Sequence, residues 1–333
     1  MGQVQDRAHG AERDRRGRGA RKAGWILRAA LAGALIAPSG LGSAQVLPET
    51  RFDQQKAWAA LLKQVEFGPR VPGTSAHTKC AEWLVEELRR SCENVRFQPF
   101  EHRWSVDGRT YRMANILAEQ NWKDAKVRVV VLAHWDSRPF ADQDPDPANR
   151  RKPVLGANDG ASGVAVVLEL ARVLKGRLKD VGVLYLLTDG EDLGPGIDEM
   201  LLGARHFAKN LPSLRPDYGI LLDMIGDKDL RVPIERYSYS SAPELVNELY
   251  ALAARAGLAR TFPKQLGEWV IDDHVPLIEA GVPTIDLIDF TYEPWHTVRD
   301  TPDQCSPESL GKVGRLMELW LLREPAYRPS KNR

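Results

Sequence analysis

The sequence predicts a single α/β domain, built as a three-layer sandwich in which helices flank a central mixed and mostly parallel sheet. Two observations predict it: strand-like segments alternate with segments of helical spacing, and the strand-like segments are almost continuously apolar. Alternating strands and helices imply a parallel sheet, and strands buried on both faces read as apolar runs. Of the 333 residues, 43% are apolar and 27% charged, as in globular proteins, and no repeat or interdomain linker is visible.

The first part of the domain is expected to hold two helices and two edge strands. Residues 52–66 place apolar side chains at helical spacing, and FGPRVPGTSAH then breaks the pattern with Gly and Pro. A second helix is expected over about 76–91. Residues 94–104 and 109–118 alternate or run apolar, which predicts two neighbouring antiparallel strands at a sheet edge.

The rest of the chain repeats strand and helix. Residues 126–134 (KVRVVVLAH) are typical of a strand buried on both faces. The polar segment 139–153 is rich in Pro and Asp, and because long loops in compact domains are commonly functional, we expect it to lie over the site. The other strands are expected over 181–188, 217–223 and 282–288, and the other helices over 161–174, 198–209, 242–256 and 306–322.

The first 44 residues are expected to be a secretory signal cleaved after Ala44, which leaves 45–333 as the catalytic domain. An Arg-rich stretch precedes an apolar run over 29–37 and small residues at Gly42 and Ala44. A disordered basic tail followed by a helix is the alternative. The apolar run is shorter than the roughly 20 residues that span a bilayer, so we expect a periplasmic or secreted protein without stable membrane insertion.

Charge and cysteine content narrow the class of partner. Lys and Arg number 46 against 45 Asp and Glu, so no overall field favours nucleic acid or a membrane. Three cysteines are too few for a disulfide framework. A disulfide between Cys80 and Cys92 is possible only if the helix that contains Cys80 ends near Ser91. Without a Cys-x-x-Cys pair, zinc thiolate ligation is not expected.

Side chains that bind metals or handle protons follow several of the predicted strands. They are His134, Asp136, Asp159, Glu191, Asp192, Asp223 and His296. In an open α/β sheet the carboxyl ends of the strands form the crevice where ligands bind, so we expect these residues to converge there. Imidazole nitrogens and carboxylate oxygens together suit zinc. The pattern therefore predicts a metalloenzyme.

Each segment also has a plainer interpretation. Asp159 precedes a helix and could serve only as its N-cap. Glu191 and Asp192 could form a solvated turn, although three acids in the four residues DGED repel one another unless a cation compensates them. His296 could be a structural histidine hydrogen-bonded to Asp300. The argument for a metal site therefore depends on all the segments together.

The motifs in combination are specific. They are FGPRVPGTSAH, AHWDSRPFADQDPD, GANDGASGVAVVLELAR, TDGED, LLDMIG, DDHVPLIEAGVPTIDLI and WHTVRDT. From about residue 52 to the last helix the chain resembles the zinc-dependent glutaminyl-peptide cyclotransferases, most closely their bacterial branch. That family shares its α/β fold with the zinc aminopeptidases. The resemblance implies that the enzyme converts N-terminal glutamine of peptides or proteins to pyroglutamate and releases ammonia.

The resemblance also implies one catalytic zinc ion per chain, held by Asp159, Asp192 and His296. Three protein ligands would leave one open position on the metal. The chain departs from the animal members of the family at three places, one of which is the segment LGPGIDEM after the DGED turn, where their tryptophan is missing. Asp192 replaces a Glu, so its carboxylate reaches one methylene less far, and Asp286 replaces a His.

The resemblance assigns the remaining roles to four residues. Glu191 would be the general acid and base, with Asp223 and Asp272 as its hydrogen-bonding partners. Trp295 would form a wall of the pocket for the glutamine side chain. Loss of a metal ligand or of the base would instead indicate a non-catalytic binding module, and the sequence retains all of them.

The strongest alternative is a zinc aminopeptidase with two metal ions. His134 and Asp223, with Asp159 bridging, are the groups that a second zinc would use, and Asp136 would then bind metal or support a ligand. In that enzyme Glu191 would activate a metal-bound water. The DDHVPL segment and the tryptophan directly before His296 favour the cyclotransferase.

Overall fold

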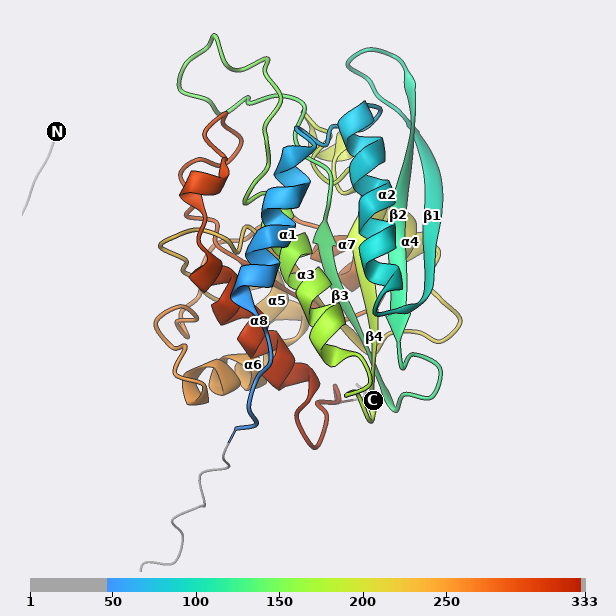
Figure 1. Ribbon diagram of the computed structural model, residues 1–333, viewed down its shortest axis with the longest axis vertical. Coiled ribbons are helices and arrows are strands. Elements are labelled where there is room, and N and C mark those ends of the chain that lie inside the picture. Colours follow the sequence, from blue (N-terminus) through green and yellow to red (C-terminus); the bar gives the residue numbers. More distant parts are fainter. Residues whose placement is uncertain (1–46, 331–333) are drawn as a thin grey trace, which may run out of the picture. The chain divides into compact units, whose positions relative to one another are not determined.

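A mixed six-stranded sheet forms the centre of the computed structural model, which describes residues 47–330 (Figure 1). The strand order is β1-β2-β4-β3-β5-β6. Strands β3 to β6 pair in parallel, whereas β1 and β2 run antiparallel at one edge, which confirms the predicted architecture. The strands are β1 Glu93–Arg103, β2 Thr110–Gln120, β3 Val127–His134, β4 Val181–Thr188, β5 Tyr218–Asp223 and β6 Thr284–Ile288.

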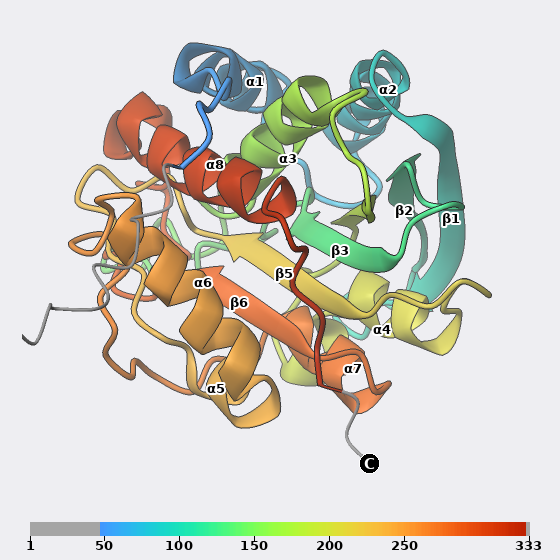
Figure 2. The same ribbon diagram turned by 90° about the horizontal axis from the view of Figure 1, so that it is seen from below.

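Helices cover both faces of this sheet and complete the three layers. Figure 2 shows α1, α2, α3 and α8 together on one side of the sheet, with α4 and α7 on the other. Helices α5 and α6 lie near the β6 edge. The helices are α1 Gln54–Glu66, α2 Ser75–Arg89, α3 Ala161–Leu174, α4 Leu202–Lys209, α5 Arg236–Ser241, α6 Pro243–Arg255, α7 His274–Glu279 and α8 Pro307–Leu321.

The central strands are apolar on both faces because each face packs on a separate core. Along β3, Val129 and Val131 belong to the core beneath α1, α3 and α8, whereas Val130 and Leu132 belong to the core beneath α4 and α7. Full burial of such a side chain contributes roughly 1.5–3 kcal/mol. The sheet is thereby held rigidly between its helices, and its strand ends form a stable base for a site.

Most predicted elements are confirmed, and the exceptions are short. Helix α3 and strand β4 begin and end where the sequence predicts. Helix α4 begins at Leu202 rather than near 198, because a separate 3₁₀ turn occupies Ile197–Glu199. The six-residue helices α5 and α7 were not predicted, since one and a half turns are too short for a periodic signal. Cys80 and Cys92 are not bridged.

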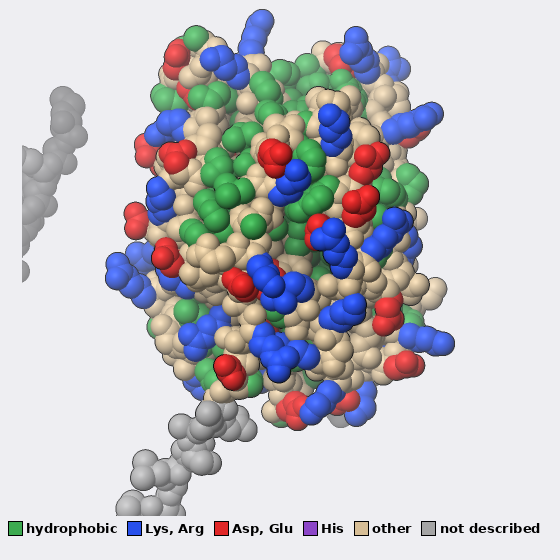
Figure 3. Space-filling view, in the orientation of Figure 1, with side chains coloured by type: hydrophobic (Ala, Val, Ile, Leu, Met, Phe, Trp, Pro, Cys, Tyr) green, Lys and Arg blue, Asp and Glu red, His purple; other side chains and the backbone are tan. Residues whose placement is uncertain are grey.

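The surface agrees with the near-neutral net charge. Positive and negative side chains are interspersed over the face drawn in Figure 3. Between residues 47 and 330, no helix has the length and apolar character needed to cross a membrane. The predicted signal over residues 1–44 lies outside the described residues.

Candidate metal centre

The predicted site residues converge at the carboxyl ends of the parallel strands. His134 ends β3 and Asp223 ends β5, whereas Glu191 and Asp192 follow β4 and His296 follows β6. All are at most 6% exposed. The loop 139–153 packs on the segment after β6, because Gln143 N–H donates to the His296 carbonyl (3.2 Å), so this loop does lie over the site.

One group of ligand atoms comes from Asp159, Asp192 and His296. Their carboxylate and imidazole atoms all lie within 4.8 Å of one another. His296 Nε2 is 3.2 Å from Asp192 Oδ1 and 3.6 Å from Asp159 Oδ2. The three residues expected to hold zinc are therefore together, and their acceptor atoms face the same point.

A second group shares Asp159 with the first. His134 Nε2 lies 2.8 Å from Asp159 Oδ1 and 3.3 Å from Asp223 Oδ1, and these three residues also meet within 4.8 Å. Asp159 directs one oxygen toward each group. The geometry thus offers positions for either one ion or two.

Asp300 holds the turn that carries Asp159 through hydrogen bonds to its backbone. The Asp300 carboxylate accepts hydrogen bonds from Asn158 N–H (2.8 Å), Asp159 N–H (3.2 Å) and the Tyr292 hydroxyl (2.8 Å). Gly160, rather than Asp159, is the N-cap of α3, so the capping interpretation is wrong. Within residues 47–330 no hydrogen bond joins His296 to Asp300 either, and the imidazole instead faces Asp142, Asp159 and Asp192.

The turn after β4 is held by Asp136. Its two carboxylate oxygens accept the backbone N–H groups of Glu191 (3.2 Å) and Asp192 (3.1 Å). Asp136 Oδ1 also lies 3.5 Å from His134 Nδ1, on the side of the imidazole away from Asp159. These contacts make Asp136 a support for both groups, since its oxygens face backbone donors and the outer ring nitrogen.

The neighbouring acid Asp189 points away from the site. It pairs with His77 Nε2 (2.8 Å) and accepts the Ala114 N–H (2.8 Å). The crowding expected for three acids in one turn is therefore partly relieved by protein donors. Glu191 and Asp192 are the two that remain directed toward the metal-binding groups.

Burial and neighbouring charge shift the acids of the site in opposite directions. Burial raises the pKa of Glu191 well above its usual value, His134 opposes this, and Asp192 adds to it. Burial also opposes ionisation of Asp192, yet the charges of His296 and Arg138 lower the pKa of that carboxyl. Glu191 is thus a stronger base than an ordinary glutamate, whereas Asp192 stays an anion suited to a cation.

Asp272 acts on Glu191 through its charge, because it is among the acids that raise the pKa of Glu191. Burial raises the pKa of Asp272 well above its usual value, and Asp223 and Asp273 raise it further. Asp272 Oδ1 accepts the Asp273 N–H (2.5 Å). In the part of the chain that the structure describes, no hydrogen bond joins Glu191 to Asp272 or Asp223.

Trp295 stacks on the imidazole of His296. Their ring centroids are 3.8 Å apart and their planes 24° from parallel, and Phe290 meets the indole edge-on at 5.2 Å. The indole also packs on the apolar cluster that contains Met224 and Val270. An apolar wall therefore stands directly beside the first metal-binding group.

Three polar residues near the site were not predicted. Arg70, fully buried, donates to the carbonyl groups of Trp135, Leu155 and Gly156, and so holds the segments that lead to Asp136 and Asp159. Arg138 and Asp142 form an ion pair beside Asp192 and His296. All three lie inside the motifs FGPRVPG and SRPFADQD. Their charge within these motifs is the sequence feature that could have marked them as site residues.

His274 is the first residue of α7. It is fully buried with Nε2 3.2 Å from Glu235 Oε2, and Asp273 is the N-cap of that helix. The Thr188 hydroxyl donates a hydrogen bond to Asp273, and this bond connects α7 to the end of β4. His274 is a buried partner of Glu235 and not a helix cap.

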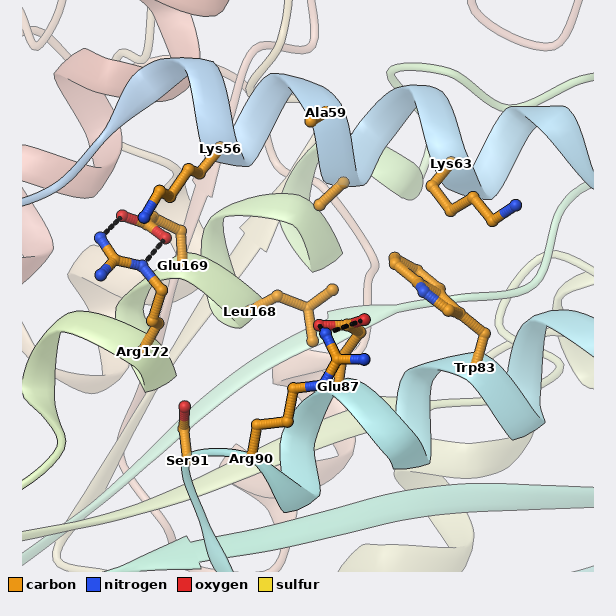
Figure 4. Close-up of a pocket in the computed structure, with 11 residues that line it drawn as sticks. Lys56, Ala59, Lys63, Trp83, Glu87, Arg90, Ser91, Leu168, Glu169 and Arg172 are labelled. Atoms are coloured by element: carbon orange, nitrogen blue, oxygen red, sulfur yellow. Dashed lines mark hydrogen bonds and ion pairs between the residues drawn. The ribbon is translucent and has the colours of Figure 1, made fainter.

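A separate groove lies between α1, α2 and α3 (Figure 4). Two ion pairs line it, Glu169 with Arg172 and Glu87 with Arg90. Trp83 lines one side. The groove shares no residue with either metal-binding group, so it is not part of the candidate centre.

Comparisons with known proteins agree on one family. The model of peptidase family M28 matches residues 115–321. Glutaminyl-peptide cyclotransferase of Drosophila melanogaster is 28% identical over 282 residues, which cover 75% of this chain and 77% of that protein. The crystal structure of Porphyromonas gingivalis glutaminyl cyclase is 38% identical with a TM-score of 0.75, covering 80% of this chain and 96% of that one.

A leucine aminopeptidase precursor from Bacteroides thetaiotaomicron VPI-5482 is also similar in structure. It is 32% identical with a TM-score of 0.79, and the match covers 84% of this chain and all of that one. The family match spans more than half of the chain and includes every residue of both metal-binding groups. The chain therefore belongs to peptidase family M28.

Proposed function

We propose that this protein is a glutaminyl-peptide cyclotransferase that uses one zinc ion. It converts N-terminal glutamine of peptides or proteins to pyroglutamate and releases ammonia. One observation carries the proposal: Asp159, Asp192 and His296 meet beside the buried Glu191, and Trp295 stacks on the histidine of that group. The names of the Drosophila and Porphyromonas relatives support this activity over others in the family.

The chemistry of the three residues fits a zinc ion. Two carboxylates and an imidazole form a donor set that zinc accepts, and all three are buried with their ligand atoms within 4.8 Å of one another. Asp159, Asp192 and His296 would hold the ion and leave one position open to substrate. When bound there, zinc would polarise the γ-carboxamide carbonyl as a Lewis acid.

Glu191 would move the proton of the reaction. The α-amine nitrogen attacks the γ-carbonyl carbon, and Glu191 accepts a proton from that nitrogen. The bond to the amide nitrogen then breaks, and Glu191 returns the proton so that ammonia leaves. Burial raises the pKa of this carboxyl, which makes Glu191 a better base and a usable acid near neutral pH.

Trp295 would position the reacting groups. The substrate supplies its own nucleophile, so holding the side-chain amide against the amine accounts for much of the rate. An indole fixed by stacking on His296 offers a flat apolar wall for the methylene groups of glutamine. Asp223 and Asp272 would tune the charge around Glu191, since Asp272 is among the acids that raise its pKa.

A zinc aminopeptidase is the second candidate. The observation that favours it is the group His134, Asp159 and Asp223, which offers a second metal position next to the first. Glu191 would then activate a metal-bound water. Trp295 beside His296 and the DDHVPL segment support the cyclotransferase instead, and full activity with one zinc ion per chain would separate the two.

The decisive experiment offers the zinc-loaded enzyme two peptides that differ only in their first residue, Gln or Leu. The proposal expects the Gln peptide to lose ammonia with its peptide bonds intact and the Leu peptide to stay unchanged. Mass spectrometry distinguishes the products. Release of free leucine with no change in the Gln peptide would contradict the proposal and establish the aminopeptidase.

Export is proposed as well, from the three-part pattern of the first 44 residues. The mature protein would act on peptides or proteins in the periplasm or outside the cell. Expression of the full chain in a bacterial host with periplasmic fractionation tests this. The expected product begins after Ala44, and an uncleaved chain in the cytoplasm would refute the signal.

A further inference from the structure

An ion pair between buried Arg138 and half-buried Asp142 connects the loop 139–153 to the candidate metal-binding group Asp159, Asp192 and His296. The Arg138 side chain is 5% exposed, and its Nε and one terminal nitrogen each donate to Asp142 at 2.8 Å. Its other terminal nitrogen donates to Asp192 Oδ1 at 2.5 Å. A guanidinium is suited to this arrangement because its planar fork can bind two carboxylates at once.

The same pair faces the histidine of the group. Asp142 Oδ1 lies 3.7 Å from His296 Nδ1, and among the residues that the structure describes that buried nitrogen has no hydrogen-bond partner. Histidines that bind metals usually donate their outer N–H to a carboxylate, which orients the ring and sets its tautomer. A closure of roughly 0.7 Å would bring Asp142 into hydrogen-bond range.

The surrounding backbone is built around this pair. A side chain at Gly194 would bring its Cβ to 2.9 Å from an Arg138 terminal nitrogen, and Gly194 has a φ of +52°, so the turn after Asp192 packs directly on the guanidinium. The loop is held as well, because Val298 N–H donates to Asp144 Oδ2 (3.1 Å). The loop therefore behaves as part of the site and not as a free lid.

We propose that the Arg138–Asp142 ion pair positions Asp192 and His296 and thereby sets the zinc affinity of the centre. Arg138 is a positioning residue, since it acts on Asp192 directly and on His296 through Asp142. This inference rests on the zinc site of the proposed function, but not on the identity of the substrate.

Zinc affinity measured by equilibrium competition with a chromophoric chelator tests the pair. Arg138→Met and Asp142→Asn should each weaken zinc binding by on the order of 10- to 100-fold. The double variant should be little weaker than the worse single variant, because both act through one pair. Asp142 is 32% exposed, so Asp142→Asn tests the idea even if Arg138→Met folds poorly.

A matched control is available on α3. Arg172 makes two hydrogen bonds to Glu169, outside the centre (Figure 4). Arg172→Met removes a similar ion pair and should leave zinc affinity unchanged. A loss equal to that of Arg138→Met would show a general stability effect and overturn the proposal.

Arg138→Lys separates geometry from charge. Lysine keeps the positive charge but cannot bind both carboxylates in the same way, so zinc affinity should still fall and the visible spectrum of the cobalt-substituted protein should change. Full affinity with an unchanged spectrum would overturn the positioning role. Affinity within about threefold of wild type in both Arg138→Met and Asp142→Asn would do the same, since that is far below the expected loss.

The wild-type protein separates this proposal from the previous one. If it binds zinc with the expected dependence on Arg138 but does not cyclise a Gln peptide, only the proposed function fails. If it cyclises the peptide while the variants retain zinc, only the positioning role fails. A wild-type chain that binds no zinc contradicts both.

Discussion

The two candidate metal-binding groups share Asp159, yet their other residues are held in different ways. His134 and Asp223 are the last residues of β3 and β5, adjacent strands that pair in parallel up to Leu132 and Leu221. Asp192 and His296 lie on loops beyond β4 and β6. His134 and Asp223 are therefore positioned by the sheet itself. Asp192 and His296 depend on side chains that other loops bring to them.

This difference shows how one fold can hold two neighbouring metal positions that differ in their sensitivity to substitution of the supporting residues. The sheet is buried between two apolar cores, so its strand ends move little. Asp192 and His296 on the loops contact the side chains of Asp136, Arg138 and Asp142. One substitution can remove each of these contacts. We therefore expect substitutions at the loop-borne group to change metal binding, and the proposed zinc position lies there.

The largest expected effect contrasts the two histidines. His296→Ala should release zinc and lower turnover by on the order of 1,000-fold or more, because the ion loses one of only three protein ligands. His134→Gln should retain about one zinc ion per chain. Metal analysis of both variants checks this, and retention by His296→Ala together with loss by His134→Gln would reverse the assignment.

Glu191→Gln sharpens the comparison by leaving both groups of ligands in place. Turnover should fall by a factor on the order of 100 or more, as expected when a positioned acid and base is lost. Zinc content should remain at the wild-type level. Steady-state ammonia release and metal analysis on the same sample give both values, and near-normal turnover would refute the role of Glu191.

Asp136→Asn acts on both groups through one residue. Its carboxylate accepts two backbone N–H groups and faces His134, and an amide offers only one acceptor. The free energy of unfolding should fall by about 1–3 kcal/mol, with turnover reduced about 10-fold as the turn of Glu191 shifts. Denaturant unfolding measures the first effect, and unchanged stability would show that the turn is held by other contacts.

The smallest effect on activity is expected for Glu235. The negative charge of this buried carboxylate is stabilised by protein donors and not by the candidate metal ion. Burial opposes its ionisation, but His274 and the Ser238 N–H and hydroxyl lower its pKa to about 2. Because the folded pKa lies below the unfolded value, this stabilisation is present above about pH 4.5 and is lost as the pH falls toward 2. Between about pH 6 and pH 3, the stability advantage of wild type over Glu235→Gln should shrink by about 2 kcal/mol.

Thermal unfolding between about pH 6 and pH 3 follows that loss. Zinc should leave the slope due to Glu235 unchanged, since His274 and Ser238 remain its partners with or without the ion. An identical pH dependence in wild type and Glu235→Gln would contradict the prediction.

Much of the fold followed from apolar patterning, because the sheet and its long helices repeat a signal over many residues. The run KVRVVVLAH predicts β3 since both faces of that strand are buried. The convergence of the acids followed from strand ends meeting at one edge. Short elements such as α7 leave no comparable pattern, because their six residues are positioned by tertiary contacts.

The supporting residues of the site were harder to predict. Arg138 and Asp142 lie in a polar, Pro-rich segment where charged residues are ordinarily solvated, and only the folded loop brings them to Asp192 and His296. Arg70 is similar: its partners are backbone carbonyls 65 and more residues away. Such pairings depend on loop geometry that residue spacing does not encode.

Anomalous X-ray diffraction above the zinc edge, on crystals of the active enzyme, tests the central claim most directly. The account predicts one strong peak, about 2.0–2.2 Å from atoms of Asp159, Asp192 and His296. A peak confined to His134 and Asp223, or two peaks of equal height in the fully active enzyme, would contradict it.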